Sequence, residues 1–284
     1  MSNSALIKSS IAKKYWMALT GLFLCLFLVG HLLGNLQLIF KTGEEGRRAF
    51  NEYAYFMGHN IFIKILSYLT YASILFHAID GILLTIQNRK ARPVKYVYSN
   101  PSANSSLPSR WMALLGSLIL VFIVTHMANF WWKMKVSEEI PLHTYKLKID
   151  ERLEQLPDID YYYTHVPSTY PIPKDTAQIE ERGTELYLKS SNLKLADSYR
   201  DLHTVVMDFF NPDVNKSAIF YVFIYVISMG VLGFHLWHGF ASSFQSLGLN
   251  HPKYNKLIKK VGQGFAVIVP FLFAIIPILI FINK

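Results

Sequence analysis

Hydrophobic residues gather in five long runs along the chain, and the charged residues lie between those runs. Each run is long enough to cross roughly 30 Å of hydrocarbon as a helix that rises about 1.5 Å per residue. The runs cover residues 15–40, 61–87, 111–132, 218–244 and 261–282. We therefore predict an all-α integral membrane protein, built as a bundle of five transmembrane helices.

Composition supports the membrane class. Of 284 residues, 52% are hydrophobic and only 17% are charged, which is too apolar for an ordinary soluble domain. The first run is longer than the core of a cleavable signal peptide and continues into Gly34 and Asn35, so we expect it to remain as a helix. Because Cys25 is the only cysteine, the chain alone cannot build a disulfide, an iron–sulfur cluster or a thiolate zinc site.

The net charge of +9 is unevenly distributed. The segment 134–217 holds 15 acidic and 10 basic residues and so carries −5, which leaves +14 for the remainder. Because this excess belongs to the short connections, it argues against a nucleic-acid partner. Those connections share one side with the N-terminus in a five-helix protein, and the positive-inside rule makes that side cytoplasmic. The basic residues are Lys8, Lys13, Lys14, Arg89, Lys90, Arg92, Lys95, Arg110, Lys253, Lys256, Lys259 and Lys260.

The segment 134–217 is predicted to be an extracytoplasmic insertion between the third and fourth helices. Leucines and valines recur across 184–210, which favours a surface-lying helix or a small cap that ends near Pro212. A partly ordered spacer is the alternative. The segment contains no recognisable repeat and no catalytic motif.

Five of the ten histidines lie inside the predicted spans, namely His31, His77, His126, His235 and His238. An ionisable side chain at membrane depth is costly and usually faces the bundle interior, although a lone histidine can simply hydrogen-bond to a neighbouring helix. From their positions in the runs, His31 and His126 lie about 5 to 7 Å from the midplane toward the outer face. His77 and His235 lie at a similar depth toward the cytoplasmic face.

Two histidines from different helices at one level can clamp a haem iron from both sides. Two levels therefore predict two haems, the outer one held by His31 and His126 and the inner one by His77 and His235. A glycine follows each inner histidine in the pattern H-x-x-x-G, which places a small residue one helical turn away, where a flat macrocycle needs room. Helix–helix packing is the alternative role of such glycines.

Other polar residues have less specific roles. His238 lies on nearly the same helix face as His235, and we expect it to hydrogen-bond nearby. Asp80 is the only acidic residue well within a span, and it is either a solvated boundary carboxylate or part of a proton path. Four histidines in the connections lack ligand spacing and are expected to be solvated: His143, His165, His203 and His251.

Short motifs recur in order through the membrane-spanning part of the chain. They are Lys13-Lys14-Tyr-Trp-Met-Ala-Leu-Thr-Gly21, His31-Leu-Leu-Gly-Asn35, Phe76-His77-Ala-Ile-Asp-Gly81, His235-Leu-Trp-His-Gly239 and Gln245-Ser-Leu-Gly248. Their order, spacing and sidedness resemble the cytochrome b membrane anchor (cytochrome b558 type) of succinate dehydrogenase and fumarate reductase, in its form with one polypeptide and two haems.

In that family the inner haem is ligated from the second and fourth helices, which implies His77 and His235. The outer haem is ligated from the first and third helices, which implies His31 and His126. The resemblance implies two haem b groups that carry electrons between an iron–sulfur subunit and a membrane quinone, mostly menaquinone. A flavoprotein subunit on the cytoplasmic side would perform the dicarboxylate chemistry, because this chain has no G-x-G-x-x-G motif and no cysteine cluster. The implied location is the bacterial inner (cytoplasmic) membrane; dimerisation and the direction of the reaction are left open.

The resemblance also implies a quinone site near the outer haem, where an acidic residue before the second helix takes up the quinol proton. Glu52 and His59 are the candidates, and a solvated loop glutamate is the alternative for Glu52. Some relatives carry a glutamate two residues before the fourth-helix ligand, but this chain has Gly233 there, which argues against a proton path at that point. The long outer segment is absent from compact members, and we expect it to cover the outer haem or to meet a periplasmic partner.

Three alternative functions share some of these features. The cytochrome b of bc-type complexes places two ligand histidines on each of two helices, whereas here each histidine has its own helix. The cytochrome b anchor of a hydrogenase or formate dehydrogenase has a periplasmic catalytic partner, which suits the long outer segment but not the N-terminal motif. A haem-free transporter or scaffold with histidines in a polar core predicts no Soret band.

Overall fold

Helices dominate the protein, and a small region of β-structure lies between the third and fourth long helices. The computed structural model describes residues 9–94, 97–98, 100–137, 139–146, 159–166, 171–174 and 176–283. Lys8 and Lys95, which belong to the predicted basic side, lie outside the described residues.

Five helical segments in the described part of the chain are long and apolar enough to cross a membrane. They are α2 (Ser10–Phe40), α4 (Ile61–Lys90), the continuous run of α7 (Met112–His126), the π-helix η1 (Met127–Trp132) and α8 (Lys133–Lys135), α10 (Ala218–Ser246), and α11 (Pro252–Ile282). The chain is therefore a multi-pass membrane protein, and the predicted spans are confirmed. The start of α11 lies earlier than predicted because the helix continues through the lysine-rich stretch that precedes the apolar run.

Polar side chains and prolines mark where several helices begin. The Ser9 hydroxyl accepts a hydrogen bond from the Ile11 amide at the start of α2. Asn60 begins α4, where its side-chain oxygen accepts a hydrogen bond of 2.9 Å from the Phe62 amide. Two short helices in the connection after α4, α5 (Pro101–Asn104) and α6 (Leu107–Arg110), each have a proline in the first turn, where its missing N–H has no helical partner to lose.

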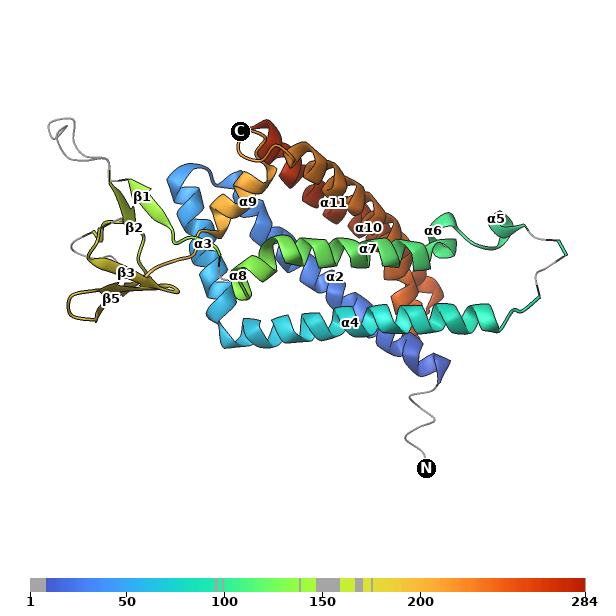
Figure 1. Cartoon of the computed structure of the whole chain (residues 1–284). Coiled ribbons are helices and arrows are strands. Elements are labelled where there is room, and N and C mark those ends of the chain that lie inside the picture. Colours follow the sequence, from blue (N-terminus) through green and yellow to red (C-terminus); the bar gives the residue numbers. More distant parts are fainter. Residues whose placement is uncertain are drawn as a thin grey trace, which may run out of the picture.

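Helix α2 runs through the bundle and contacts α4, α10 and α11 (Figure 1). Helices α10 and α11 form a tightly packed hairpin. In contrast, α7 contacts α10 and α4 but buries none of its own residues, all of which the structure describes. The core that joins α2 to the hairpin includes Leu32, Leu38, Val222, Val269, Ile276 and Ile280.

The two ends of the bundle differ. The start of α2 and the connection that carries α5 and α6 lie at one end, and the C-terminus and α9 lie at the other, beside the β-structure (Figure 1). We call these the basic end and the cap end. This arrangement places the basic connections together, as the positive-inside argument requires; the membrane face that each end meets stays a prediction.

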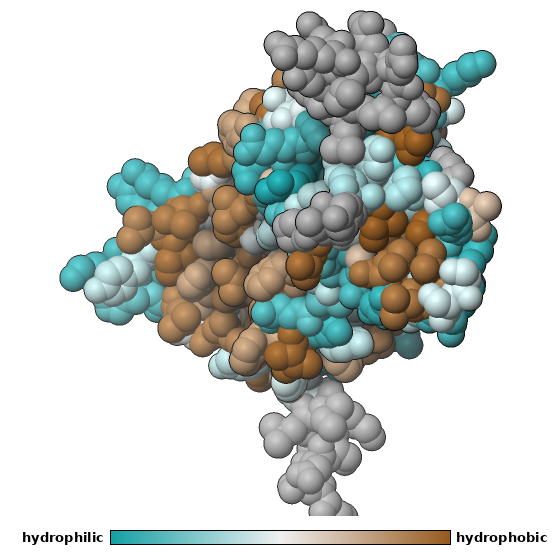
Figure 2. All heavy atoms as spheres, turned by 90° about the vertical axis from the view of Figure 1, so that its left-hand side faces the viewer, coloured by the Kyte–Doolittle hydropathy of each residue, from teal (hydrophilic) through white to brown (hydrophobic). Residues whose placement is uncertain are grey.

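Large apolar side chains cover the outer surfaces of the long helices. Examples of exposed residues are Leu26, Phe62, Val121, Phe223 and Phe271. Seen from the cap end, hydrophilic residues of the cap lie beside a broad hydrophobic flank (Figure 2). Such a surface suits lipid as the surrounding solvent, since water-soluble monomers rarely expose apolar patches of this extent.

A helix lies between the first two spans, where the sequence predicted only a connection. This helix, α3 (Gly43–His59), contacts α2, α4 and α9 at the cap end. The first turn of α3 contains two acidic residues, Glu44 and Glu45, whose negative charge is stabilised by the positive end of the helix dipole. Arg48 and Glu52 also form an i,i+4 ion pair on its surface.

The cap is built from two small antiparallel sheets and one helix in the described residues. Its elements are β1 (Thr144–Lys146) paired with β2 (Asp160–Tyr162), the meander of β3 (Ile179–Arg182), β4 (Glu185–Leu188) and β5 (Leu193–Asp197), and then α9 (Leu202–Phe210). Leu186 is fully buried and packs with Leu142, Tyr162 and Ile172. The cap therefore has a small hydrophobic core of its own.

The predicted helix across 184–210 is wrong for its first part, which forms β4 and β5. Gly183, with φ of 66°, and Asn192, with φ of 54°, adopt the left-handed conformation that reverses the chain before and after β4. The remaining part is helical as predicted: α9 ends at Phe210, shortly before Pro212.

A buried network of polar side chains fastens the cap to α3. Asp201, the N-cap of α9, is only 2% exposed and accepts hydrogen bonds from Arg47 and, at 2.8 Å, from the Asn51 amide. Asn51 Nδ2 also lies 3.3 Å from His143 Nδ1, and His143 Nε2 lies 2.6 Å from Glu44 Oε1. A neutral imidazole satisfies both contacts, since Nδ1 accepts from the amide while Nε2–H donates to the carboxylate.

The prediction that the histidines of the connections are solvated is wrong for His143, which is fully buried. His165 and His203 are half-buried, and His251 is exposed as predicted. His143 is buried because the chain after α8 folds back onto α3, a long-range contact that local sequence spacing does not reveal.

Burial lowers the pKa of the His143 imidazole, against the opposing effect of its hydrogen bond to Glu44. For Asp201, burial alone would raise the pKa, but hydrogen bonds from Arg47, Asn51 and the Thr204 amide lower it to about 2. Both groups therefore bind protons less readily in the docked cap than in an undocked one. Docking is therefore weakened at any pH at which the undocked state binds a proton and the docked state does not.

We expect Asp201→Ala to release the cap from α3, because Arg47 and Asn51 would keep buried donors without an acceptor. Removing one partner of a buried ion pair typically costs about 3 to 5 kcal/mol. Hydrogen–deuterium exchange on the membrane-embedded protein should show lost protection in β1 and α9 and unchanged protection in α11. Glu45→Ala, at an exposed position of the same helix, is the matched control. Equal protection in the Asp201 variant and the wild type would contradict the assigned role of this network.

We also expect cap docking to weaken on acidification in two steps. The first begins as the pH falls below about 6.5, the pKa of a free histidine, because an undocked His143 then takes up a proton. The second runs from about pH 4 toward pH 2 as Asp201 titrates. Protease protection of the cap, measured against pH, should show the first step in the wild type and a smaller one in His143→Gln, because burial also lowers the pKa of His165 and of His203. A profile without a step near pH 6.5 would rule out a neutral docked His143.

Candidate functional site

The histidines of the spans meet in two pairs. His31 from α2 and His126 from α7 have ring centroids 5.8 Å apart, and the rings stand nearly perpendicular at 84°. His77 from α4 and His235 from α10 have ring centroids 6.1 Å apart, at 68°. The structure thus brings together the partners that the depth argument predicts.

This spacing has a chemical meaning. An imidazole nitrogen lies about 2 Å from a metal that it ligates, as it does with zinc. Two rings that ligate one ion from opposite sides therefore have centroids roughly 6 Å apart. Among the described residues, no three His, Cys, Asp or Glu side chains gather where they could hold a metal ion. Each pair therefore suits a metal that arrives with most of its own ligands, as a haem iron does.

The inner ligand candidate on α4 is oriented by α2. His77 Nδ1 lies 3.1 Å from the Met17 carbonyl oxygen and 3.3 Å from Thr20 Oγ1. Because a carbonyl can only accept, this contact places the proton on Nδ1 and leaves the lone pair on Nε2. Second-shell hydrogen bonds of this kind fix the tautomer of metal-ligating histidines.

The two histidines of the outer pair have different hydrogen-bond partners. His126 Nδ1 lies 3.3 Å from the Tyr225 hydroxyl of α10, which also accepts a hydrogen bond of 3.4 Å from Asn129. Asn129 lies in η1, and π-helical turns are often found at functional sites because they shift the register of the side chains that follow. On α2, His31 Nδ1 lies 3.4 Å from the amide nitrogen of Asn35.

His235 differs from its partners. Its Nδ1 is buried and lacks a hydrogen-bond partner among the described residues. An unsatisfied buried polar atom typically costs about 1 to 3 kcal/mol. No hydrogen bond from the described residues reaches Nε2 of His31, His77, His126 or His235 either. For His77 the Met17 carbonyl thus leaves the lone pair on Nε2 for a ligand, whereas the Asn35 amide can only donate to His31 Nδ1, and both nitrogens of His235 lack a partner among the described residues.

The outer pair lies among aromatic rings. Phe27 stacks on His31 with a centroid distance of 5.3 Å, and Phe122 stacks on His126 at 5.7 Å. Phe273 and Phe130 approach the same two histidines at 5.6 and 5.5 Å. These rings give the outer pair an apolar surrounding, which suits a flat hydrophobic macrocycle.

The glycines divide into two groups. A Cβ atom on Gly21 would lie 3.1 Å from His77 Cε1, and one on Gly116 would lie 3.7 Å from His235 Cε1, so each inner histidine lies against a glycine of a neighbouring helix. Gly81, one turn from His77, would meet no atom within 4 Å. In contrast, Gly34 and Gly233 pack closely, against Tyr53 and against the backbone of α11. Helix packing is therefore the role of Gly34 and Gly233, while the role of Gly81 as room beside a ligand stays a prediction.

The remaining polar residues of the spans are less constrained. His238, one turn after His235, is half-buried and makes no ring contact with His77 in the described part of the chain. Asp80 is half-buried near the basic end, and no ion pair of the described residues involves it. Its assignment as a boundary carboxylate or as part of a proton path stays open.

The two quinone-site candidates lie on α3 at the cap end. Glu52 is 41% exposed and accepts a hydrogen bond of 2.6 Å from the Tyr163 hydroxyl of the cap. Burial, this hydrogen bond and the charge of Glu52 raise the pKa of Tyr163, so its hydroxyl stays protonated and can donate. His59 is exposed and stacks on Tyr55 at 3.9 Å. Neither candidate hydrogen-bonds to the paired histidines in the described residues.

Several residues of this site were not predicted from the sequence. Tyr225 and Asn129 orient His126, Thr20 contacts His77, and Gly116 makes room for His235. The signal for Tyr225, Asn129 and Thr20 is a hydroxyl or amide within an apolar run, because buried polar groups in a membrane need partners.

Compared with known proteins, the chain matches no family model, no curated sequence and no solved structure.

Proposed function

We propose that this protein is the dihaem cytochrome b membrane anchor of a succinate:quinone oxidoreductase. The observation that supports this most directly is the pairing of four imidazoles from α2, α4, α7 and α10 at centroid distances of 5.8 and 6.1 Å. The ordered motifs of the sequence resemble that family and favour the same pairing.

The residue roles follow from the site. His31 and His126 would hold the outer haem, and His77 and His235 the inner one, with His77 ligating through Nε2. The haems would supply one-electron transfer across the span of the bundle. The hydrogen bond from His77 Nδ1 to Met17 keeps that ring in the ligating tautomer, and Tyr225 offers His126 a similar partner.

The partners follow from the sidedness. The basic end would face the cytoplasm, where an iron–sulfur subunit and its flavoprotein partner would deliver or receive electrons near His77 and His235. The cap end would then face outward, where a quinone, with menaquinone favoured by the resemblance, would exchange electrons near the outer haem. The Tyr163 hydroxyl holds Glu52 in place, and the Glu52 carboxylate would pass a proton between a quinone oxygen and the outer solvent.

One alternative gains some support from the fold of the cap. A compact outer domain with its own core could receive a periplasmic catalytic subunit, as in the cytochrome b anchors of hydrogenases or formate dehydrogenases. The two functions differ in the subunits that co-purify with the chain: an iron–sulfur protein and a flavoprotein at the basic end, or a periplasmic enzyme at the cap.

We expect reduced-minus-oxidised spectra of the purified complex to give two b-type haems per chain. Alanine at His31 or His126 should remove the same haem signal, and alanine at His77 or His235 should remove the other, because one lost axial ligand leaves the iron without its opposed pair. His238→Ala is the matched control and should keep both signals. A folded wild-type preparation without a Soret band would overturn the cytochrome function and favour a haem-free scaffold.

We expect Glu52→Gln to lower quinone-linked turnover by about 100-fold, the scale of a lost general acid or base. Both haem signals should stay, because Glu52 has no contact with the paired histidines. Glu45→Gln, on the exposed surface of the same helix, is the control.

Tyr163→Phe separates a proton role of Glu52 from a role in holding the cap, because it removes the hydrogen bond and leaves the carboxylate in place. Turnover should fall far less in Tyr163→Phe than in Glu52→Gln. Equal losses in both variants, together with a loosened cap, would make Glu52 a cap anchor and remove it from the quinone site.

A further inference from the structure

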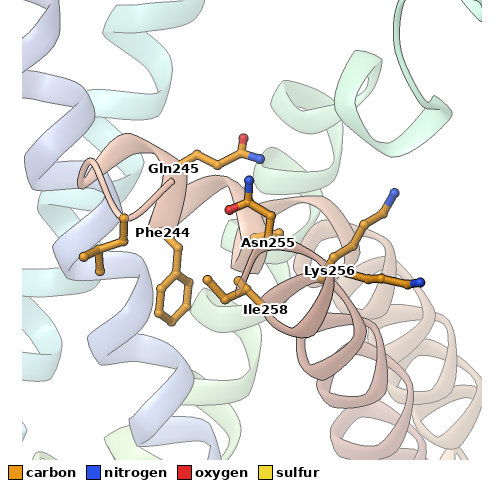
Figure 3. Close-up of a pocket in the computed structure, with 8 residues that line it drawn as sticks. Phe244, Gln245, Asn255, Lys256 and Ile258 are labelled. Carbon is orange, nitrogen blue, oxygen red and sulfur yellow. The ribbon is translucent and has the colours of Figure 1, made fainter. Parts of the chain in front are cut away.

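A groove at the basic end lies between the last turns of α10 and the first turns of α11. It encloses about 310 Å³, and its lining combines apolar and polar side chains: Phe244, Gln245, Leu249, Asn255, Lys256 and Lys259. The amides of Gln245 and Asn255 face the same space from opposite helices, and Lys256 extends from α11 away from these amides (Figure 3). The groove thus has an apolar floor and a rim of hydrogen-bond donors.

The charge of this groove is not neutralised. No aspartate or glutamate follows Asp213 in the sequence, so the hairpin of α10 and α11 has no acidic residue. Within the described residues, neither Lys256 nor Lys259 takes part in an ion pair. The two ammonium groups lie one helical turn apart on α11, where one anion can reach both.

The two amide side chains of the groove have N–H groups that can donate to a ligand. Asn255 is held in place, since its Oδ1 accepts from the His251 amide at 3.0 Å and its Nδ2 donates to Asn250 at 2.6 Å. This leaves one N–H of Asn255 to donate. The amide of Gln245 has no hydrogen-bond partner among the described residues, so both of its N–H groups are free to donate.

Apolar side chains continue from the groove onto the surface that meets lipid. Leu249 is 56% exposed at the mouth of the groove, and Phe244 and Ile258 also line it. A ligand with an anionic head and apolar chains can therefore place its head among the lysines while its chains follow the helices. Neither a free anion nor a soluble acidic protein would use both parts of this surface.

We propose that this groove binds the head group of an anionic phospholipid. The ammonium groups of Lys256 and Lys259 neutralise the phosphate, the amides of Gln245 and Asn255 donate to its oxygens or to the glycerol, and the acyl chains lie against Leu249 and Ile258. Basic pockets between transmembrane helices on the cytoplasmic side are suited to such head groups. This site is independent of the haem function, because none of its residues contacts the paired histidines in the described part of the chain.

The test measures lipid retention by the purified, detergent-solubilised protein with its co-purifying subunits. The protein is delipidated, exchanged into mixed micelles that contain equal amounts of phosphatidylglycerol and phosphatidylcholine, and analysed for bound lipid by native mass spectrometry. We expect a preference for phosphatidylglycerol that falls roughly 30-fold in K256Q/K259Q, as two lysines near an anionic surface contribute about 1 kcal/mol each and about 1.4 kcal/mol is a factor of ten. K253Q/K260Q removes the same charge from the same helix outside the groove and should keep the preference.

Three further results decide the proposal. K256R/K259R should retain the preference, because the positive charge is kept. Size-exclusion elution and haem spectra identify any variant that fails to fold. If a lysine variant fails, Gln245→Leu tests the groove with the lysines in place and should lower the retention of phosphatidylglycerol. The proposal is overturned if glycerol phosphate competes as well as the lipid does, or if K256Q/K259Q keeps its lipid preference but loses a soluble subunit, which would make the groove a protein-docking surface.

Discussion

Imidazole rings inside long apolar helices impose the main constraint on this fold. A ring that can ionise is expensive at membrane depth, and each one must find partners within the bundle because lipid offers none. Here the rings from α2 and α7 face each other, as do those from α4 and α10. The positions of the helices follow: α2 must lie beside α4 to supply the Met17 carbonyl to His77, and α10 must lie beside α7 to supply Tyr225 to His126.

The same constraint explains why α7 packs loosely. It buries no residue of its own, yet it carries His126 and lies against His235 through Gly116. A helix with this role is positioned by a few polar and aromatic contacts, such as the hydrogen bond of 2.7 Å from Trp131 to Tyr71, more than by a hydrophobic seam. The π-helical turn of η1 after His126 is consistent with that, since it directs Asn129 toward Tyr225. If the paired rings share bound groups, those groups would complete the packing of α7.

The sequence was sufficient for the spans and for the pairing of their histidines, because hydrophobic length and helical rise are local quantities. It was not sufficient for α3, which was treated as a connection between two spans, nor for the strands β4 and β5, where a leucine-rich stretch was compatible with a helix. Gly183 and Asn192 were the available signals for turns there. The burial of His143 could not be predicted, because it depends on contacts with Asn51 and Glu44, which lie 92 and 99 residues away in the chain. Tyr225 was missed for the same reason: its role depends on the neighbouring helix.

The two ends of the protein differ in whether their charged side chains form ion pairs, and this difference has a physical consequence. At the cap end, the half-buried Arg47 pairs with the buried Asp201, and their charges cancel locally while holding α3 against the cap. At the basic end, Lys256 and Lys259 have no acidic neighbour in the hairpin, so their charge is left for an external anion. A paired charge stabilises a fold from within, whereas an unpaired one orients the molecule toward what surrounds it. The cap end is therefore self-contained, and the basic end depends for its electrostatic balance on the lipid or protein surface against which it lies.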